Sequence, residues 1–350
     1  MKVAFVAGGS GGHIYPAIAI AQALKQRDAV TQIIFFTSRQ ALERKVLADN
    51  GFSSIPFFSG NAFTGFWVAL YQLIKNRPDY LVNMGGVIGT VAAVPAYLLR
   101  IPILTHECNI IAGRATRFTG YFSRTVTVPV KETLKYFGAK AVVTGNPVRS
   151  SIGKIDRAAA AGQLQIEVAK FTVLVLGGSQ GALKINELIP ELVRQLPENF
   201  QLLHITGTRD HARIRDKVLT VIPQHLRQNY FIYPFVADPA PLYAAADVAI
   251  SRAGAGVLAE LAAAGVPSIL IPYPYAADNH QEINARRFKQ AGAAELILNR
   301  ELSVGRLSSI IKSWAASAQN LADMRAKTLA LGWPEASERI ADIIYKGIKA

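Results

Sequence analysis

The segment KVAFVAGGSGGHIYPAIAIAQAL, residues 2–24, has the pattern of a strand, a glycine-rich turn and a helix. Its first six residues are an apolar run typical of a buried parallel strand, and the apolar spacing from Ile14 to Leu24 is helical. Four glycines surround Ser10 between them, and His13 follows. Glycine tolerates positive φ and lets a ligand approach the backbone amides closely. The turn thus lies at a helix N-terminus, where unpaired N–H groups and the helix dipole favour a phosphate.

Two familiar phosphate-binding motifs do not match this turn. A Walker A loop ends in Gly-Lys-Ser/Thr, and no such tripeptide follows the first strand. The dinucleotide fingerprint needs a glycine where Ile14 stands and an acidic residue at the end of the next strand, TQIIFFTS at 31–38. A dinucleotide-dependent oxidoreductase is therefore disfavoured.

Length and composition indicate a globular protein of two or three domains, with 350 residues of which 51% are hydrophobic and 18% charged. The single cysteine, Cys108, excludes an internal disulfide framework, and we expect it to be a small buried apolar residue. The first residues already resemble a strand, so we expect no signal peptide. The longest apolar run, residues 87–99, is too short to span a bilayer and contains Pro95. We therefore expect a soluble or peripheral protein.

The positive charge is concentrated in the first part of the chain. Residues 1–150 hold 16 Lys and Arg against 6 Asp and Glu, so they carry +10 of the net charge of +14. Such a field attracts nucleic acid, anionic lipid or phosphorylated substrates. The chain has no recognised nucleic-acid motif and no dense run of Lys and Arg, which disfavours nucleic acid as a partner.

One segment favours an anionic membrane surface as a partner. In SGNAFTGFWVALYQLIKNR, residues 59–77, a helical stripe of apolar residues is closed by Lys75 and Arg77. The stripe comprises Phe63, Phe66, Trp67, Leu70, Leu73 and Ile74. Such a helix can lie in the headgroup region with its cations on anionic lipid, or it can simply pack against the sheet.

The opening pattern returns in FTVLVLGGSQGALKINELI, residues 171–189, so Ser10 and Ser179 occupy equivalent turns. Around each copy, apolar runs alternate with helical patterns, which indicates right-handed βαβ crossovers and parallel sheets. The sequence therefore predicts an α/β fold with two Rossmann-like, doubly wound parallel-sheet domains.

The segment 145–170 lacks a strand pattern and is expected to join the two domains as a linker with a short helix. We expect an N-terminal domain over residues 1–160 and a C-terminal domain over residues 161–334. A last helix, 335–350, is expected to pack back on the N-terminal domain. Ligands of doubly wound sheets bind beyond the carboxyl ends of the strands, so domains that face each other would hold two phosphate-bearing molecules opposite one another. That arrangement suits group transfer.

The most specific segment, residues 247–285, has parts suited to a nucleotide sugar. Gly254 and Gly256 precede a helix and can present amides to a diphosphate. Glu260 lies in the first turns of that helix and can accept hydrogen bonds from two ribose hydroxyls. Its surroundings, VLAELAAAG, are apolar, so a carboxylate there needs a partner. A polar loop with Asp278, His280 and Gln281 follows the next strand.

Five motifs occur in order along the chain: GGSGGH at 8–13, HECN at 106–109, GNPVR at 145–149, GGSQGA at 177–182, and SRAGAGVLAELAAAG with PYPYAADNHQ within 251–281. Together they resemble the MurG family, the UDP-N-acetylglucosamine transferases that convert lipid I to lipid II in bacterial cell-wall synthesis. The resemblance covers almost the whole chain and implies a GT-B arrangement, with the two domains facing across a cleft. It also implies that the first domain binds undecaprenyl-linked lipid I and the second UDP-N-acetylglucosamine, at the cytoplasmic face of the bacterial inner membrane.

The family's pattern implies roles for the matching positions of this chain. The implied donor-binding residues are Ser10, Gly11, Gly12, Asn109, Arg149, Ser179, Gln180, Gly181, Val236, Arg252, Gly254, Ala255, Gly256, Val257, Leu258, Ala259, Glu260, His280 and Gln281. Val236 would bind uracil through its backbone. The implied acceptor-diphosphate residues are Gly12, His13, Gly85 and Gly86, and the catalytic candidates are His13, His106 and Glu107.

The chain departs from the family's pattern at three positions: Val87 replaces a common tyrosine, Cys108 a common glutamine, and Val257 a residue that often carries a hydroxyl. Val87 and Cys108 fall on the acceptor side, so the acceptor is less well defined than the donor. Oligomeric state is open.

The implied reaction inverts the anomeric carbon, with negative charge growing on the departing UDP. Glycine-loop amides, a helix dipole and Arg149 or Arg252 would stabilise that charge. No Asp-x-Asp occurs in the chain, so we expect no metal, and no cofactor is implied. His13 is the first candidate base because a helix N-terminus opposes imidazole protonation. His106 beside Glu107 is the second, and either histidine could instead bind the acceptor diphosphate.

Two alternatives remain at this point. Another lipid glycosyltransferase of the same fold, moving glucose or galactose from UDP to diacylglycerol, would need the same donor site and membrane contact. A non-catalytic membrane-bound partner subunit would lose the base and the donor carboxylate, and the presence of His13 and Glu260 disfavours it.

Overall fold

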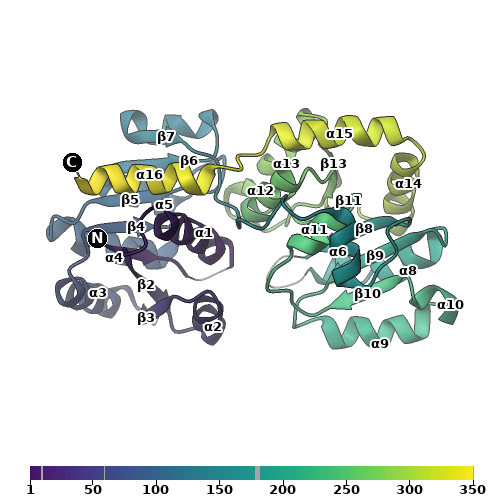
Figure 1. Ribbon diagram of the computed structural model, residues 1–350, viewed down its shortest axis with the longest axis horizontal. Coiled ribbons are helices and arrows are strands. Elements are labelled where there is room, and N and C mark those ends of the chain that lie inside the picture. Colours follow the sequence, from purple (N-terminus) through teal and green to yellow (C-terminus); the bar gives the residue numbers. More distant parts are fainter. Residues whose placement is uncertain (9–10, 59, 178–181, 350) are drawn as a thin grey trace. The chain divides into compact units, whose positions relative to one another are not determined.

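The computed structural model describes residues 1–8, 11–58, 60–177 and 182–349. It divides into two compact units, which we describe separately: unit 1 is Met1–Arg149 with Trp333–Ala350, and unit 2 is Ser150–Gly332 (Figure 1). The division after Arg149 comes earlier than residue 160, because the short helix that follows packs within unit 2.

Unit 1 is built on a parallel sheet with the order β3-β2-β1-β4-β5-β6-β7, seven strands among the described residues. Its elements are β1 (Lys2–Val6), α1 (Gly11–Arg27), β2 (Gln32–Ser38), α2 (Ala41–Asp49), β3 (Ser53–Phe58), α3 (Ala62–Asn76), β4 (Tyr80–Asn83), α4 (Gly86–Leu98), β5 (Ile103–His106), α5 (Arg114–Phe122), β6 (Thr125–Val128), two 3-10 turns (Lys131–Tyr136 and Gly138–Lys140), β7 (Ala141–Val143) and α16 (Ala336–Lys349). The strand order reverses direction at β1, as in doubly wound folds.

Helices cover both faces of this sheet because the strand side chains alternate between them. Val3 and Phe5 of β1 pack with α1, α2 and α16. Ala4 and Val6 of the same strand pack with α3 and α4 on the opposite face. A strand buried on both faces is therefore apolar throughout, as the opening segment predicted.

The last helix, α16, belongs to unit 1. Its buried residues Ile340, Ala341 and Ile344 join the core between α1 and the sheet, and Arg27 of α1 forms an ion pair with Asp342. The chain thus returns to its first domain at its end.

Unit 2 repeats the architecture with the order β10-β9-β8-β11-β12-β13, six parallel strands in the part described. Its elements are α6 (Arg157–Leu164), β8 (Phe171–Leu176), α7 (Leu183–Asn186), α8 (Ile189–Gln195), β9 (Phe200–Ile205), α9 (His211–Val221), α10 (Gln224–Arg227), β10 (Tyr230–Tyr233), α11 (Ala240–Ala245), β11 (Val248–Ser251), α12 (Ala255–Ala264), β12 (Ser268–Leu270), a 3-10 turn (Ala277–Asn279), α13 (His280–Gln290), β13 (Ala294–Leu296), α14 (Val304–Ala315) and α15 (Ala318–Ala330). One face packs against α8, α9 and α14, and the other against α6, α11, α12 and α13. The predicted α/β class with two doubly wound parallel sheets is confirmed.

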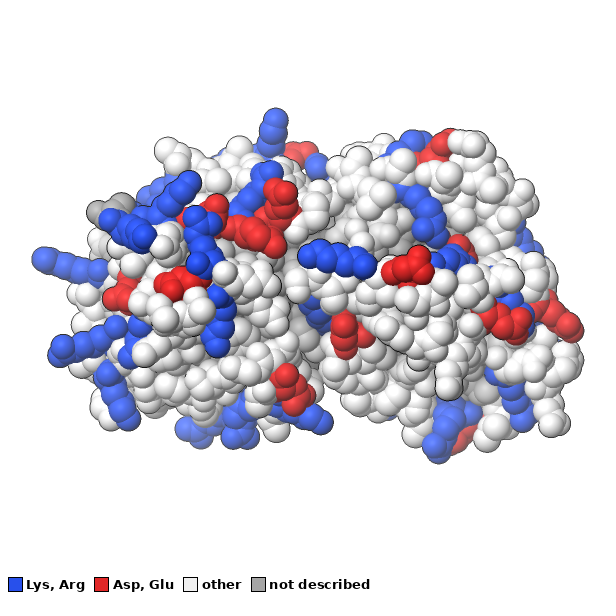
Figure 2. All heavy atoms as spheres, in the orientation of Figure 1, with Lys and Arg blue, Asp and Glu red and all other residues white. Residues whose placement is uncertain are grey.

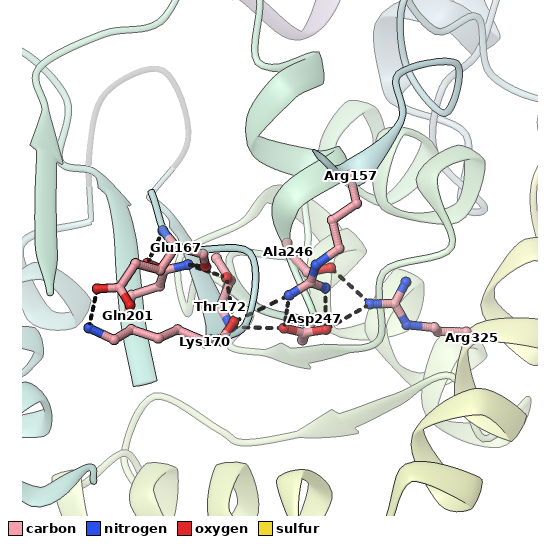
Figure 3. Close-up of polar contacts among 8 residues, drawn as sticks. All are labelled: Arg157, Glu167, Lys170, Thr172, Gln201, Ala246, Asp247 and Arg325. Carbon is pink, nitrogen blue, oxygen red and sulfur yellow. Dashed lines mark hydrogen bonds and ion pairs between the residues drawn. The ribbon is translucent and has the colours of Figure 1, made fainter. Parts of the chain in front are cut away.

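Asp247, just before β11, ties α6 and α15 to the amino edge of the unit 2 sheet (Figure 3). Its carboxylate accepts from Arg157 at 2.5 Å and 2.8 Å, from Arg325 at 3.3 Å, and from the backbone N–H of Thr172 at 2.8 Å. Half-buried charges are stable there because each has a close opposite partner. The cluster explains why α6 belongs to unit 2.

Within the described residues, no helix combines the length and the apolar character needed to cross a membrane. The apolar run at 87–99 forms most of α4, which carries Pro95 inside it.

Candidate functional site

The carboxyl edge of the unit 1 sheet brings together the loops that follow β1, β4 and β5. Val6 pairs with Asn83, and Asn83 pairs with Thr105 in the next strand, so these three strands end at one level. In doubly wound sheets this edge binds ligands. The residues predicted near the acceptor lie at this edge, in the ends of the strands, in the connections that follow them or in the first turns of the next helices.

His13 lies in the first turn of α1, and its ring is half-buried. The Nδ1 atom is 3.1 Å from the carbonyl oxygen of Gly8. A carbonyl can only accept, so Nδ1 carries the proton in this bond and Nε2 is the basic nitrogen of the neutral ring. The arrangement gives His13 the tautomer that a general base needs.

Gly85 and Gly86 form the turn between β4 and α4, with φ of 85° and 73°. The buried Asn83 side chain accepts from the Gly85 N–H at 2.8 Å and holds this turn. A Cβ on Gly86 would lie 3.2 Å from Cε1 of His13. Only glycine suits both the backbone and this approach, so the turn can stay close to the imidazole.

His106, at the end of β5, is fully buried, and both of its ring nitrogens are engaged. Nε2 is 3.2 Å from Oδ1 of Asn146 and Nδ1 is 2.9 Å from Oγ1 of Thr127. Burial lowers the pKa of His106 to about 4, the Asn146 hydrogen bond opposes this, and His13 adds a small lowering charge effect. This histidine is therefore neutral at pH 7 and braces β5 against its neighbours, which favours His13 as the base.

Glu107 is 2% exposed and organises the loop that leads into α5. Oε1 accepts from the backbone N–H and the side chain of Asn109 at 2.7 Å and 3.2 Å. Oε2 accepts from the Gly113 N–H at 2.8 Å and from the Thr116 hydroxyl. These donors occupy both oxygens, so Glu107 holds Asn109 and the helix start in place.

Cys108 is half-buried as a residue, and burial of its thiol raises its pKa far above the usual range, with Glu107 as a further cause. Its carbonyl accepts from Asn146 Nδ2 at 2.8 Å. A protonated thiol is a poor nucleophile, which agrees with the expected small apolar residue.

Arg149 lies at the same edge of unit 1 as α1. Its guanidinium carbon is 3.8 Å from the ring centroid of Tyr15, two residues after His13. The cation thus sits over the first turns of α1, where a phosphate would find both amides and charge. Arg149 was predicted from the sequence, but its contact with the Tyr15 ring was not.

Several predicted donor residues lie outside the described residues: Ser10, Ser179, Gln180 and Gly181. Gly11 and Gly12 begin α1, and Gly12 is exposed. Val87, in α4, is 62% exposed.

In unit 2, the N-terminus of α12 is open. Gly254 is the N-cap, and a Cβ added to Gly254 or Gly256 would meet no atom within 4 Å. The first amides of the helix can therefore be reached by a diphosphate. Ala255, Val257 and Ala259 are half-buried, whereas Leu258 points into the core and is 4% exposed, so Leu258 can contribute only through its backbone.

Glu260 lies one turn further along α12 and is half-buried. Its Oε2 accepts a hydrogen bond of 2.9 Å from the hydroxyl of Tyr243, in α11. The sequence predicts that this carboxylate needs a partner. It does not identify Tyr243, because nothing in PLYAAADVAI indicates that the tyrosine hydroxyl meets a polar group.

Arg252 and Gln281 brace the loop after β12. Nη1 of Arg252 donates to the carbonyls of Ile271 and Pro272 and to Oδ1 of Asn299, each at 3.1 Å. Gln281 Oε1 accepts from the Tyr273 N–H at 3.0 Å. Two further predicted residues also have contacts in unit 2: His280 bonds the Ala277 carbonyl at 2.7 Å, and Val236, after β10, is half-buried against the core. The loop after β12 is thus held by polar side chains from the segments on either side of it.

The predicted aromatic stripe of α3 divides between two faces. Ala69 and Leu73 are buried, and Phe66 is partly buried against the core. Phe63 and Trp67 are exposed at 73% and 55%, and Tyr71 and Ile74 are exposed as well. The inner residues of the stripe therefore pack against the sheet, and the outer aromatic residues are exposed on the surface of unit 1.

Exposed apolar side chains continue onto the neighbouring helices α4 and α5. We name as the α3–α5 surface the set Phe63, Trp67, Tyr71, Ile74, Tyr97, Leu98, Phe118 and Tyr121. Cations accompany it: Lys75 lies over the Tyr71 ring, and Lys140 donates to the Tyr121 carbonyl at 3.0 Å. Lys and Arg side chains project widely from the face of unit 1 drawn in Figure 2.

The described residues contain no group of three or more His, Cys, Asp or Glu side chains placed to hold a metal ion.

The glycosyltransferase family 28 N-terminal domain matches residues 3–128, and the family's C-terminal domain matches residues 172–343. The UDP-N-acetylglucosamine--N-acetylmuramyl-(pentapeptide) pyrophosphoryl-undecaprenol N-acetylglucosamine transferase of Thermodesulfovibrio yellowstonii is 36% identical, with 98% of each chain covered. The protein of that name from Thermoanaerobacter sp. is also 36% identical, with 100% of both chains covered.

Solved structures also resemble this chain. Acinetobacter baumannii MurG has a TM-score of 0.76 at 25% identity, covering 99% of this chain and 100% of that one. A UDP-GlcNAc 2-epimerase from Neisseria meningitidis, bound to UDP-GlcNAc, has a TM-score of 0.71 at 16% identity, covering 99% of this chain and 100% of that one. At that identity the second likeness shows the fold alone. A transferase and an epimerase share the fold, so activity must be argued from site residues and the more similar relatives.

Proposed function

The chain belongs to glycosyltransferase family 28 and is related to the MurG enzymes along its whole length, and we propose the following transfer reaction for it. It moves N-acetylglucosamine from UDP-N-acetylglucosamine to the 4-hydroxyl of N-acetylmuramic acid in undecaprenyl-linked lipid I. The product is lipid II, so the reaction is a step of peptidoglycan synthesis.

The observation that carries this proposal is the His13 tautomer. With Nδ1–H held by the Gly8 carbonyl, Nε2 can take the proton of the acceptor hydroxyl. The hydroxyl oxygen forms a bond to the anomeric carbon as the bond from that carbon to the diphosphate oxygen breaks, and UDP leaves with the electron pair. Attack from the face opposite the leaving group turns an α-linked donor into a β-linked product.

Fixed positive potential supports departure of UDP. The open amides of α12 at Gly254–Gly256 supply it in unit 2, and Arg149 supplies a cation in unit 1. Preorganised groups of this kind stabilise growing negative charge without reorganising during the reaction. Glu260 accepts from the ribose hydroxyls and positions the donor, while the loop braced by Arg252 and Gln281 covers the sugar.

The acceptor's lipid chain requires contact with a membrane. The α3–α5 surface and the cations beside it suit anionic headgroups, with the aromatic rings in the interfacial region. The protein then acts as a peripheral protein at the cytoplasmic face of the bacterial inner membrane.

The decisive assay combines the purified full-length protein with UDP-N-acetylglucosamine and a lipid I analogue carrying a short, soluble lipid chain. We expect a disaccharide product by mass spectrometry, with UDP released in equal amount. UDP-glucose and UDP-galactose, each with lipid I analogue or diacylglycerol, are the controls. Transfer to diacylglycerol alone, or conversion of the donor to its 2-epimer without transfer, would contradict the proposal.

A further inference from the structure

Tyr243 contacts Glu260, the carboxylate proposed to hold the ribose of the donor. The phenol is 2% exposed and sits in the core that α11 shares with α6, α12 and β8. Its hydroxyl donates to Oε2 of Glu260 at 2.9 Å. A buried aromatic ring cannot change rotamer without disturbing its neighbours, so this hydroxyl is a fixed point on the edge of the core.

We propose that Tyr243 is a positioning residue that orients the Glu260 carboxylate for the two ribose hydroxyls of the nucleotide donor. The inference rests on the proposed function, because it takes the UDP-sugar as the ligand of α12. Tyr243 itself touches no part of the donor in this account and acts only through Glu260.

The physical reason lies in the flexibility of glutamate. A free glutamate side chain has several rotatable bonds, and ordering it on ligand binding costs conformational free energy. A carboxylate has about four lone-pair positions, so it can accept from ribose hydroxyls in addition to the hydrogen bond from Tyr243. The site therefore orders the carboxylate before the ribose arrives, which strengthens binding without any added contact to the ligand.

The surroundings support a specific orienting role. Glu260 is on an otherwise apolar helix, VLAELAAAG, so a hydrogen-bond donor for its carboxylate has to come from another element. The Tyr243 bond crosses between two helices, α11 and α12, that pack against one another in the same core. The position of the carboxylate is therefore fixed by two helices of unit 2 and not by its own helix alone.

The test compares binding of UDP and 2′-deoxy-UDP by calorimetry, in the full-length protein and in Tyr243→Phe. Loss of one ribose hydroxyl should weaken binding to the unchanged protein, since Glu260 then accepts one bond fewer. Tyr243→Phe keeps the ring and removes only the hydroxyl, so we expect UDP binding to weaken by about three- to tenfold. The ratio of the affinity for UDP to the affinity for 2′-deoxy-UDP should shrink by about threefold. In a Glu260→Ala background, Tyr243→Phe should have no further effect on either ligand.

A matched control is Tyr230→Phe. Tyr230 is also a nearly buried tyrosine of unit 2, but its hydroxyl bonds Nδ1 of His204 instead of Glu260. This variant should leave the ligand ratio unchanged even if it lowers the melting temperature. Should Tyr243→Phe prove unstable, Tyr243→3-fluorotyrosine restores a stronger donor hydroxyl and should preserve or raise the ratio.

The outcomes separate the two claims. If Tyr243→Phe weakens the binding of UDP and of 2′-deoxy-UDP by the same factor, the ratio of the two affinities is unchanged. That result overturns the positioning role and leaves the proposed function standing. An unchanged protein that binds no UDP overturns the proposed function itself. A smaller ratio in Tyr243→Phe, together with an unchanged ratio in Tyr230→Phe, supports the inference.

Discussion

His13 Nδ1 and the carbonyl oxygen of Gly8 lie 3.1 Å apart, across the glycine turn that precedes α1. The bond joins the end of β1 to the first turn of the helix and selects the imidazole tautomer with Nε2 basic. The chain between β1 and α1 therefore brings a backbone acceptor within reach of the His13 ring.

Removal of the His13 imidazole should abolish proton transfer with little effect on the donor. We expect His13→Ala to lower kcat by roughly a hundredfold or more, the usual scale for a general base. His13→Asn keeps an N–H that can donate to Gly8 but has no basic nitrogen, so it should lose as much. Steady-state kinetics with the soluble acceptor provide the measurement.

The pH profile distinguishes a base from a phosphate ligand at this position. Turnover of the unchanged protein should fall at acidic pH because protonated imidazole cannot accept the hydroxyl proton, and the variants should lack this limb. A variant with normal kcat and a raised acceptor KM would instead make His13 a ligand of the acceptor diphosphate.

Glu260 should govern nucleotide affinity. Glu260→Ala removes charge-assisted hydrogen bonds worth roughly 1.5 to 3 kcal/mol, so UDP binding should weaken by about ten- to a hundredfold. Calorimetry with UDP measures the change. Unchanged affinity would rule out a ribose contact for this carboxylate.

The α3–α5 surface should be separable from catalysis. Phe63→Ser with Trp67→Ser should reduce binding to phosphatidylglycerol vesicles, because both rings are exposed, and should leave turnover of the soluble acceptor nearly unchanged. Leu219→Ser, at an equally exposed leucine of α9, serves as the control. Vesicle binding that survives the double substitution would place the membrane contact elsewhere.

Asp247 should be important for the stability of unit 2. Asp247→Asn leaves Arg157 and Arg325 near each other without the carboxylate between them, and their partial exposure moderates the penalty. We expect a loss of about 2 kcal/mol in the free energy of unfolding, measured by denaturant titration. Donor affinity of the folded variant should be unchanged because Asp247 precedes β11, whereas the N-terminus of α12 follows the carboxyl end of that strand.

Two buried histidines should make the fold sensitive to acid. Burial lowers the pKa of His106 to about 4 and of His204 to about 3, whereas an unfolded histidine titrates near 6.5. The unfolded chain therefore binds more protons than the folded one below about pH 6.5, and stability falls as pH drops from there toward the folded values. At pH 5 each buried histidine should lower the free energy of unfolding by about 2 kcal/mol. Thermal unfolding of His204→Gln should depend less steeply on pH in this window, and an unchanged slope would contradict the account.

Much of the site could be predicted because it is local. The glycine turn, His13 at the start of α1, and Glu260 in the second turn of α12 are short-range features, and strand and helix periods place them at the carboxyl edges of their sheets. The unit boundary was misplaced by about ten residues because α6 is assigned to unit 2 by Arg157 and Asp247, which are 90 residues apart in the chain.

From the sequence alone one obtains the alternation of strands and helices, the two parallel sheets and the residue types at each phosphate turn, since these depend on side-chain period and on glycine's backbone freedom. Burial and hydrogen-bond partners depend instead on which elements pack together, and those contacts join residues far apart in the chain. Tertiary packing therefore decided that Glu107 holds a loop, that the aromatic stripe of α3 has an inner and an outer part, and that Tyr243, 17 residues before Glu260, reaches its carboxylate.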